Sequence, residues 1–420
     1  MATLNSDEPM PLAEARRVIQ DLAVWASPEW VGLTDAAGRP AAVTVRAPFA
    51  LPRLPRSAMD GYALSSAALP PSPAGHLSVR LEVVGELGPA EWRDLVVPPG
   101  ACVAVATGTS LPPGTDAVVP WEWTRREGTD VVINHRPASG ENVVAPGELS
   151  AAGQVLVLAG TPVDGRHLAA LAAYGQTGLW VRRRLRVVLV ETGDEVVEVG
   201  RPLPRGRVYN SSGPALMAEL GSWGADVTDL GLHPDRPAVL TDALGLALGL
   251  LPDVVITTGG VSVGGHDLVP DTCRSLGVDT LFWRVQMKPG KAVYLGRADA
   301  TLVFGLSGNP HVALASYYVL VRPALARLAG LNQTGSHLGR LARDWSGTVK
   351  HGVSLVWAGR DADGAYFDLG HVPVLDALVR AEALLLLPRR PQPYQAGDLV
   401  EVVDIDQGHS RVRAAGTDHG

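Results

Sequence analysis

The side chains best placed to do chemistry in this sequence are two lysines in a chain that holds only three. Lys288 and Lys291 flank the dipeptide Pro289-Gly290, and the remaining lysine is Lys350. Two ammonium groups beside one tight turn point into the same space, which suits a multiply charged oxyanion. The alternative is a solvated basic turn. Because lysine is so rare in this chain, we favour the oxyanion site.

A glycine-rich loop, Gly259-Gly260-Val261-Ser262-Val263-Gly264-Gly265, follows a short apolar run. Glycine lets backbone N–H groups come close to an anion, and Ser262 can add a hydroxyl donor. Taken alone, such a loop is more often a tight turn than a phosphate site. Asp267 comes next, at a position that suits either a helix cap or a Mg²⁺ ligand facing phosphates.

Two further loops carry polar groups at the ends of apolar runs. Ser307-Gly308-Asn309-Pro310 places a proline at the first position of an expected helix, which leaves N–H groups free for a ligand. Thr192-Gly193-Asp194-Glu195 presents paired carboxylates that suit a metal ion or a pterin ring. Together, the loops that end successive strands indicate a phosphate-bearing anionic ligand more strongly than any one of them does.

The elements that must position these loops alternate between strand and helix. Apolar runs typical of buried parallel strands occupy 187–190, 254–258 and 302–304. Helices are expected at 210–220, from Asp235 onward and after Pro310. This alternation predicts a doubly wound, mostly parallel α/β domain whose ligand lies at the carboxyl ends of the strands.

The rest of the chain predicts three smaller domains and a tail, so the fold class is α/β multidomain. A small α+β linking domain begins with a helix expected over 11–26. The expected bounds are 6–51 with 144–182 for the discontinuous linking domain, 52–143 for a β-rich insert domain, 183–330 for the α/β domain, 331–408 for a C-terminal β domain and 409–420 for a disordered tail. Within the insert, Ser57-Ala58-Met59-Asp60-Gly61-Tyr62-Ala63 and Thr107-Gly108-Thr109 each resemble a turn when taken alone.

The composition excludes several classes of protein. With 46% hydrophobic residues among 420, the chain can bury sizeable cores, and its net charge of −7 argues against a nucleic-acid partner. No apolar run is long enough to span a membrane, and the acidic N-terminus does not resemble a signal peptide. Cys102 and Cys273 lack metal-ligand spacing and are expected to be buried in a reducing compartment. We therefore expect a cytoplasmic protein.

These stretches together resemble the molybdopterin molybdenumtransferase family, which includes MoeA and the gephyrin E domain. The matching stretches are SAMDGYAL, TGTSLPPGTDAVV, GENVVAPGE, TGDE, ITTGGVSVGGHD, MKPGK and GLSGNP, in the family's order over roughly residues 10 to 405. The resemblance implies a homodimer of four-domain subunits with a cleft shared between them. It also implies insertion of molybdate into adenylated molybdopterin, with Mg²⁺ as cofactor and AMP as product.

The resemblance further implies a role for each matching residue. The glycine-rich loop would cradle the adenylate phosphate, Asp267 would bind Mg²⁺, and the two lysines would bind molybdate. The implied catalytic residues are Asp60, Asp235, Asp267, Lys288 and Lys291. The implied cofactor-binding residues are Thr107, Asp194, Glu195, Gly259, Gly260, Ser262, Gly264, Gly308, Asn309 and Pro310.

Several positions depart from the family pattern, including Ser307 where proline is usual and the stretch Asn142-Val143-Val144, which lacks an expected arginine. Leu149 stands where the family has aspartate, and Val312 and Val372 stand where it has serine. An alternative is therefore a divergent paralogue that binds a nucleotide or pterin without insertase activity and acts as a binding or scaffold protein. A third interpretation, a pyrophosphatase-like module of the competence-damage-inducible family, is disfavoured because that family lacks the SAMDGYA domain.

Overall fold

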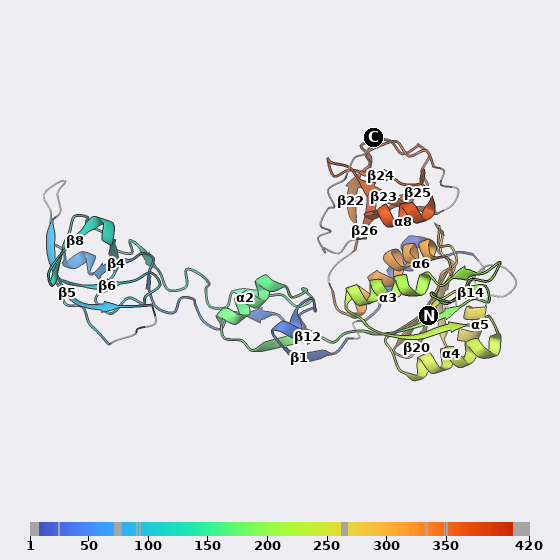
Figure 1. Cartoon of the computed structure of the whole chain (residues 1–420), viewed down its shortest axis with the longest axis horizontal. Coiled ribbons are helices and arrows are strands. Elements are labelled where there is room, and N and C mark those ends of the chain that lie inside the picture. Colours follow the sequence, from blue (N-terminus) through green and yellow to red (C-terminus); the bar gives the residue numbers. More distant parts are fainter. Residues whose placement is uncertain are drawn as a thin grey trace. The chain divides into compact units, whose positions relative to one another are not determined.

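The computed structural model describes residues 8–23, 26–70, 78–89, 91, 94–261, 268–331, 335–347, 349 and 352–405. The chain divides into two compact units (Figure 1). Unit 1 contains Met1–Val43, Ala159–Asp164 and Gly178–Gly420, and unit 2 contains Thr44–Leu158 and Gly165–Thr177. The predicted division into four domains is finer than this and stays a prediction.

A six-stranded sheet forms the centre of unit 1, in the order β16-β13-β17-β21-β20-β18. Its strands are β13 (Arg186–Thr192), β16 (Asp226–His233), β17 (Val254–Thr258), β18 (Asp279–Trp283), β20 (Tyr294–Ala298) and β21 (Thr301–Leu306). The four strands from β16 to β21 are parallel, whereas β20 is antiparallel to both of its neighbours. The predicted mostly parallel sheet is thus confirmed.

Helices cover both faces of this sheet, which explains why its strands are apolar on both sides. The helices are α3 (Ser212–Trp223), α4 (Pro237–Gly249), α5 (Leu268–Ser275), α6 (Pro310–Ser316), the π-helical turn η4 (Tyr317–Val321) and α7 (Arg322–Leu328). Val187 and Leu189 of β13 pack in one core with α3 and α6, while Val188 and Val190 pack in another with α4 and α5. The domain is therefore doubly wound, as predicted.

Three of the predicted helices have different bounds in the structure. α3 begins at Ser212 and α4 at Pro237, each two residues later than expected. The N-terminal helix α1 (Leu12–Gln20) is shorter than the predicted 11–26. Leu22 and Ala26 continue the apolar spacing because they pack in the same core, but the N–H of Ala26 donates to the carbonyl of Leu328 in α7. The apolar spacing beyond Gln20 therefore arises because these residues are buried, and not because the helix continues.

Unit 1 also contains a C-terminal sheet in the order β19-β23-β25-β26-β22. Its elements are β19 (Met287–Lys288), β22 (His337–Arg340), β23 (Val353–Arg360), β24 (Tyr366–Asp368), α8 (Val374–Arg380), β25 (Ala383–Pro388) and β26 (Leu399–Asp404). The smaller pairs are β1 (Pro28–Gly32) with β12 (Gly178–Arg182) and β14 (Val196–Val197) with β15 (Val208–Tyr209). The predicted C-terminal β region is confirmed.

Unit 2 is built on a second six-stranded sheet, in the order β7-β4-β6-β5-β9-β8. Its strands are β4 (Gly61–Leu64), β5 (Val79–Leu87), β6 (Ala101–Val105), β7 (Ala117–Pro120), β8 (Thr124–Glu127) and β9 (Asp130–Ile133). Short elements accompany it: β2 (Val45–Arg46), β3 (Arg56–Ser57), β10 (Val143–Val144), β11 (Val155–Val157) and α2 (Gly165–Ala173). The predicted β-rich insert is confirmed as a sheet with a core on each face.

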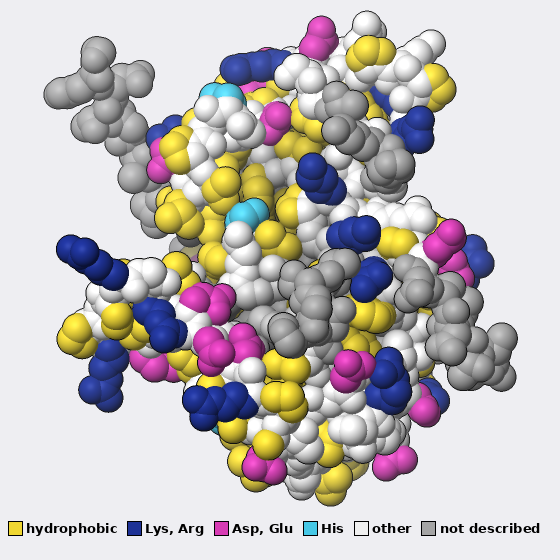
Figure 2. Space-filling view, turned by 90° about the vertical axis from the view of Figure 1, so that its right-hand side faces the viewer, with side chains coloured by type: hydrophobic (Ala, Val, Ile, Leu, Met, Phe, Trp, Pro, Cys, Tyr) yellow, Lys and Arg dark blue, Asp and Glu magenta, His cyan; other side chains and the backbone are white. Residues whose placement is uncertain are grey.

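The described residues present a surface of mixed charge and two buried cysteines. On the face in Figure 2, basic side chains are interspersed with acidic ones over the described part of the chain. None of the helices in the described ranges combines the length and the apolar character that a membrane crossing requires. Cys102 and Cys273 are both buried free thiols, as expected.

Candidate functional site

Three of the predicted loops leave the sheet of unit 1 at the carboxyl ends of its parallel strands. Thr258 at the end of β17 pairs with Glu191 of β13 and with Leu306 at the end of β21. The strand ends are therefore level, and the loops that begin at Thr192, Gly259 and Ser307 start side by side. We call this margin of the sheet the carboxyl edge.

The double glycine at Gly259 and Gly260 is required by close packing between these loops. The N–H of Gly259 donates to the carbonyl of Leu306 at 3.0 Å, and a Cβ at Gly259 would lie 2.4 Å from the carbonyl oxygen of Thr192. Gly259 and Gly260 also have φ angles of +92° and +64°, which favour glycine. Ser262, Gly264 and Asp267 lie outside the described residues.

Residues at the start of α3 form hydrogen bonds both to the strand β13 and to the Ser307-Gly308-Asn309-Pro310 loop. The hydroxyl of Ser212 donates to the carbonyl of Gly308 at 2.8 Å. The Oδ1 atom of Asn210 accepts the N–H of Gly213 at 3.1 Å, and its Nδ2 donates to Oε2 of Glu191 at 2.8 Å. These contacts fix the position of the loop relative to the strand.

Glu191 is a functional candidate that the sequence analysis did not identify. Its side chain is 2% exposed, and its Oε1 atom is buried without a hydrogen-bond partner among the described residues. Burial raises the pKa of Glu191 to about 7, the hydrogen bond from Asn210 lowers it, and the charges of Asp229 and Glu198 raise it further. The only sequence signal was a charged residue inside an apolar strand.

Two of the predicted carboxylates meet at the carboxyl edge. The N–H of Asp194 lies 3.4 Å from Oδ2 of Asp235, and the N–H of Asp235 lies 3.3 Å from Oδ1 of Asp194. The other oxygen of Asp235, Oδ1, is buried and has no partner within the described part of the chain. Asp194 and Glu195 are exposed. Thr192 adds a buried hydroxyl oxygen that is likewise unpartnered there.

The lysine turn reaches the same edge by a route that the sequence did not predict. It lies in the connection between β18 and β20, where Trp283 pairs with Tyr294 and Tyr294 pairs with Gly305. The connection therefore begins and ends level with the carboxyl ends of the parallel strands. On the way, Lys288 pairs with Ser354 as part of β19, so the turn is attached to the C-terminal sheet.

The two ammonium groups of this turn are available to a ligand. Lys288 and Lys291 are exposed, and neither makes an ion pair with a described carboxylate. Between them, the peptide before Pro289 is cis and Gly290 has a φ of +98°. A Cβ at Gly290 would lie 2.8 Å from the hydroxyl of Ser316 in α6, so glycine lets the turn pack against that helix.

In unit 2 the structure brings together the two residues predicted there. The N–H and the hydroxyl of Thr107 both donate to Oδ1 of Asp60, at 2.7 and 3.0 Å. Both side chains are exposed. The carboxylate of Asp60 is thus oriented by Thr107, and its other oxygen stays open to a ligand.

Leu149, Val312 and Val372, which depart from the family pattern, contribute no polar side chain. Leu149 is 72% exposed in unit 2, and Val372 packs against the core of unit 1. Val312 lies in the first turn of α6 beside His311, whose pKa is lowered by burial. Within the described residues, no group of three or more His, Cys, Asp or Glu side chains is arranged to hold a metal ion.

Most of the chain matches known protein families and relatives. Residues 10–175 match the family described as MoeA N-terminal region (domain I and II), and residues 188–327 match a probable molybdopterin binding domain. The molybdopterin molybdenumtransferase of Haemophilus influenzae is 33% identical over 326 residues, which cover 77% of this chain and 79% of that protein. A molybdopterin molybdenumtransferase of Staphylococcus epidermidis is 28% identical over 388 residues, covering 89% and 90%.

A solved structure shows the same fold. The crystal structure of the molybdopterin biosynthesis MoeA protein from Pyrococcus horikosii superposes with a TM-score of 0.83 and 26% sequence identity. The match covers 95% of this chain and 100% of that one. The predicted multidomain α/β architecture is therefore that of a known structural family.

Proposed function

The chain belongs to the molybdopterin molybdenumtransferase family, and from this premise we propose that it inserts molybdate into adenylated molybdopterin and releases AMP. The observation that carries the proposal is the carboxyl edge of the sheet in unit 1. There, glycine loops meet buried oxygen atoms that have no partner among the described residues, and the connection that carries Lys288 and Lys291 begins and ends level with the strand ends. This combination suits a substrate that joins a nucleotide phosphate to an oxyanion.

Each group has a part in this proposal. Lys288 and Lys291 bind molybdate, whose two negative charges need charge-assisted donors. The backbone N–H groups of Gly260 and Gly308 hold the adenylate phosphate at the first turn of α6, which Asn309 and Pro310 begin. Asp194 and Glu195 border the pterin. Within unit 2, the Asp60 carboxylate that Thr107 orients is a ligand-binding group in its own right.

We propose that a divalent cation also binds at the carboxyl edge. Carboxylate oxygens are the ligands that Mg²⁺ prefers, and the buried Oδ1 of Asp235 lacks a partner in the described chain. In this proposal Asp267, together with Asp235, holds Mg²⁺, which neutralises charge on the phosphates. Ser262 and Gly264 are further proposed phosphate-binding residues.

The decisive experiment replaces the two lysines. Because a molybdate dianion needs charge-assisted donors, Lys288→Ala or Lys291→Ala is expected to weaken apparent molybdate affinity about tenfold or more, which corresponds to about 1.4 kcal/mol. Lys→Arg should rescue only partly, because a planar guanidinium replaces a compact ammonium. The measurement is AMP release from adenylated molybdopterin as molybdate is varied.

Arg297→Ala is the matched control, since Arg297 is an exposed cation of the same unit on β20. AMP binding should be nearly unchanged in all the lysine variants, because the glycine loops supply its donors. Wild-type protein without molybdate-dependent AMP release, matched by both alanine variants, would contradict the proposal and favour a binding paralogue.

Assembly and location are further parts of the proposal. The family relationship supports a homodimer, and sedimentation at micromolar protein concentration should give twice the mass of the chain. The two buried free thiols support a reducing, cytoplasmic compartment. A monomer in sedimentation would contradict the proposed assembly.

A further inference from the structure

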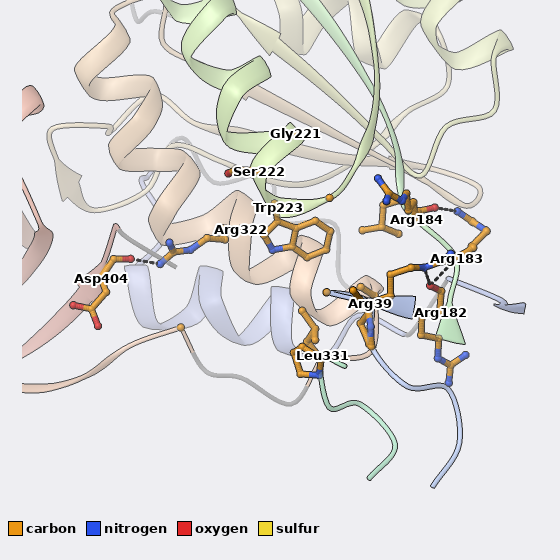
Figure 3. Close-up of a pocket in the computed structure, with 18 of the residues that line it drawn as sticks. Arg39, Arg182, Arg183, Arg184, Gly221, Ser222, Trp223, Arg322, Leu331 and Asp404 are labelled. Carbon is orange, nitrogen blue, oxygen red and sulfur yellow. Dashed lines mark hydrogen bonds between the residues drawn. The ribbon is translucent and has the colours of Figure 1, made fainter. Parts of the chain in front are cut away.

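A second cluster of charged groups lies at the opposite margin of the same sheet, where the parallel strands begin. Residues just before Arg186, the first residue of β13, and residues at the end of α3 line a cavity of about 730 Å³ (Figure 3). Among its described lining residues, five are arginines and one is a carboxylate: Arg39, Arg182, Arg183, Arg184, Arg322 and Asp404. None of the residues predicted for the carboxyl edge is among them. We call this region the arginine cavity.

Three of these arginines are fixed by partners and form a rigid wall. Arg183 binds both carboxylate oxygens of Asp253 at 2.7 Å. Arg39 pairs with Glu29, and its Nε donates to the carbonyl of Arg182 at 3.2 Å. Arg182 donates from Nη1 to a backbone carbonyl at 3.0 Å. Their positions are therefore set before any ligand binds.

The charge of Arg322 is not neutralised by a described carboxylate. Its side chain is 6% exposed, its Nη2 donates to the backbone carbonyl of Asp404 at 2.7 Å, and its Nη1 is buried without a described partner. The carboxylate of Asp404 lies instead 3.2 Å from Arg360 and 3.3 Å from His337. Burial accordingly lowers the pKa of Arg322. An anion in the cavity would compensate this charge.

Arg184 and Trp223 supply the accessible groups. The Arg184 side chain is exposed and makes no ion pair within the described residues. Trp223 is half-buried, and in Figure 3 its ring lies between the Arg322 guanidinium and the arginines at 182–184. A flat apolar ring flanked by cations suits an aromatic ligand that carries a negative charge.

The partial negative charge at the C-terminal end of α3 disfavours an anion, but only weakly. The C-terminus of a helix carries partial negative charge on its last carbonyl groups. Here the N–H of Gly224 donates to the carbonyl of Gly221, and that of Ala225 donates to the carbonyl of Leu220. Two of the carbonyls are thus satisfied, and the excess of arginine side chains outweighs the rest.

We propose that the arginine cavity binds a nucleoside monophosphate, with its base against Trp223 and its phosphate at Arg184. The cavity volume lies within the range of about 300–1,000 Å³ usual for small-molecule sites. The phosphate dianion meets an exposed guanidinium, and the buried charge of Arg322 attracts it from the other side of the ring. This site is separate from the proposed active site and does not depend on it.

The test titrates the full-length protein with AMP and compares matched variants by calorimetry. Arg184→Gln and Trp223→Leu should each weaken one class of AMP site about tenfold, because each removes a charged donor or a stacking surface. Arg297→Gln removes the same charge from an exposed position outside the cavity and should leave binding unchanged. Inorganic phosphate and adenosine alone should each bind at least tenfold more weakly than AMP.

The outcomes separate this proposal from the function proposed above. If Arg184→Gln and Trp223→Leu bind AMP as the wild type does, the cavity is not a nucleotide site. If phosphate binds as tightly as AMP, the site recognises an inorganic anion and the proposal is wrong about its ligand. AMP release in the insertase assay should be unchanged in Arg184→Gln, so absence of that activity in wild-type protein contradicts only the proposed function.

Arg322→Met gives an independent readout. Removing an uncompensated buried charge should leave the unliganded protein at least as thermally stable as the wild type. AMP should raise the melting temperature of the wild type by more than that of this variant. A variant that is less stable without ligand, and equally stabilised by AMP, would show that Arg322 is structural and would contradict its role in the cavity.

Discussion

The two margins of the sheet in unit 1 differ in whether their charged and polar groups have partners. Where the strands begin, Arg183 is bound by both oxygens of Asp253, and Arg39 and Arg182 have carboxylate or backbone partners. Where the strands end, Glu191, Thr192 and Asp235 each keep a buried oxygen atom without a described partner. The same strands therefore carry a largely paired margin and a largely unpaired one.

The paired groups stabilise the fold, whereas the unpartnered groups are available to a ligand. Buried polar atoms without partners destabilise a protein, so a cluster of them at loops of glycine indicates a place that a ligand completes. The paired margin fixes the entry of β13, while the arginine cavity beside it retains charge from Arg184 and Arg322. Four substitutions test that distinction.

Asp253→Ala should have the largest effect, a loss of about 3 kcal/mol in the free energy of unfolding. Asp253 is 4% exposed and also accepts the N–H of Arg186 at 2.8 Å, so its removal leaves a guanidinium and a backbone donor unpaired. Chemical denaturation measures the loss. The double variant Arg183→Met, Asp253→Leu should recover part of it, and a fully stable Asp253→Ala protein would contradict the description of this margin.

Gly213→Ala should lower the free energy of unfolding by about 2 kcal/mol, because it disturbs Glu191 at the unpaired margin. The new Cβ would lie 1.4 Å from Oε1 of Glu191, so the carboxyl must move and its hydrogen bond from Asn210 is lost. Thermal denaturation of the single variant measures this. Adding Glu191→Ala removes the clash, and the double variant should then be more stable than Gly213→Ala alone; equal stability of the two would show that Glu191 is not the obstacle.

Glu191→Gln should change how stability depends on pH. Because burial raises the pKa of Glu191 to about 7, above its value in the unfolded chain, its contribution is fully present below the unfolded pKa and is lost as pH rises through 7. Glutamine stays neutral at every pH. The free energy of unfolding of the variant, relative to that of the wild type, should therefore rise by about 2 kcal/mol from pH 5.5 to pH 8. Denaturant unfolding at both pH values checks this, and parallel pH profiles would contradict a titrating Glu191.

Arg184→Gln should have the smallest effect on folding, within about 0.5 kcal/mol of the wild type. Its side chain is exposed and has no described ion-pair partner. Chemical denaturation measures the difference, with Arg297→Gln as the control. A loss above 1 kcal/mol in the free energy of unfolding would show that Arg184 is structural, like the paired arginines. It would contradict its description as a cation available to a ligand.

Local sequence pattern determined much of this protein. Buried strands at 187–190, 254–258 and 302–304 followed from apolar runs, because strands covered on both faces need apolar residues throughout. Glycine loops at their ends and the scarcity of lysine identified the carboxyl edge. Family motifs identified Asp60 and Thr107, which the fold brings into direct hydrogen bonding.

Tertiary structure decided which groups have partners. Sequence could not show that Glu191 is buried against Asn210, or that the lysine turn is attached to β23 of the C-terminal sheet. The arginine cavity collects residues as far apart as Arg39, Trp223 and Asp404, with no local pattern to mark it. Pairing and burial depend on residues distant in the chain, and these contacts fix the charge and the pKa of a side chain.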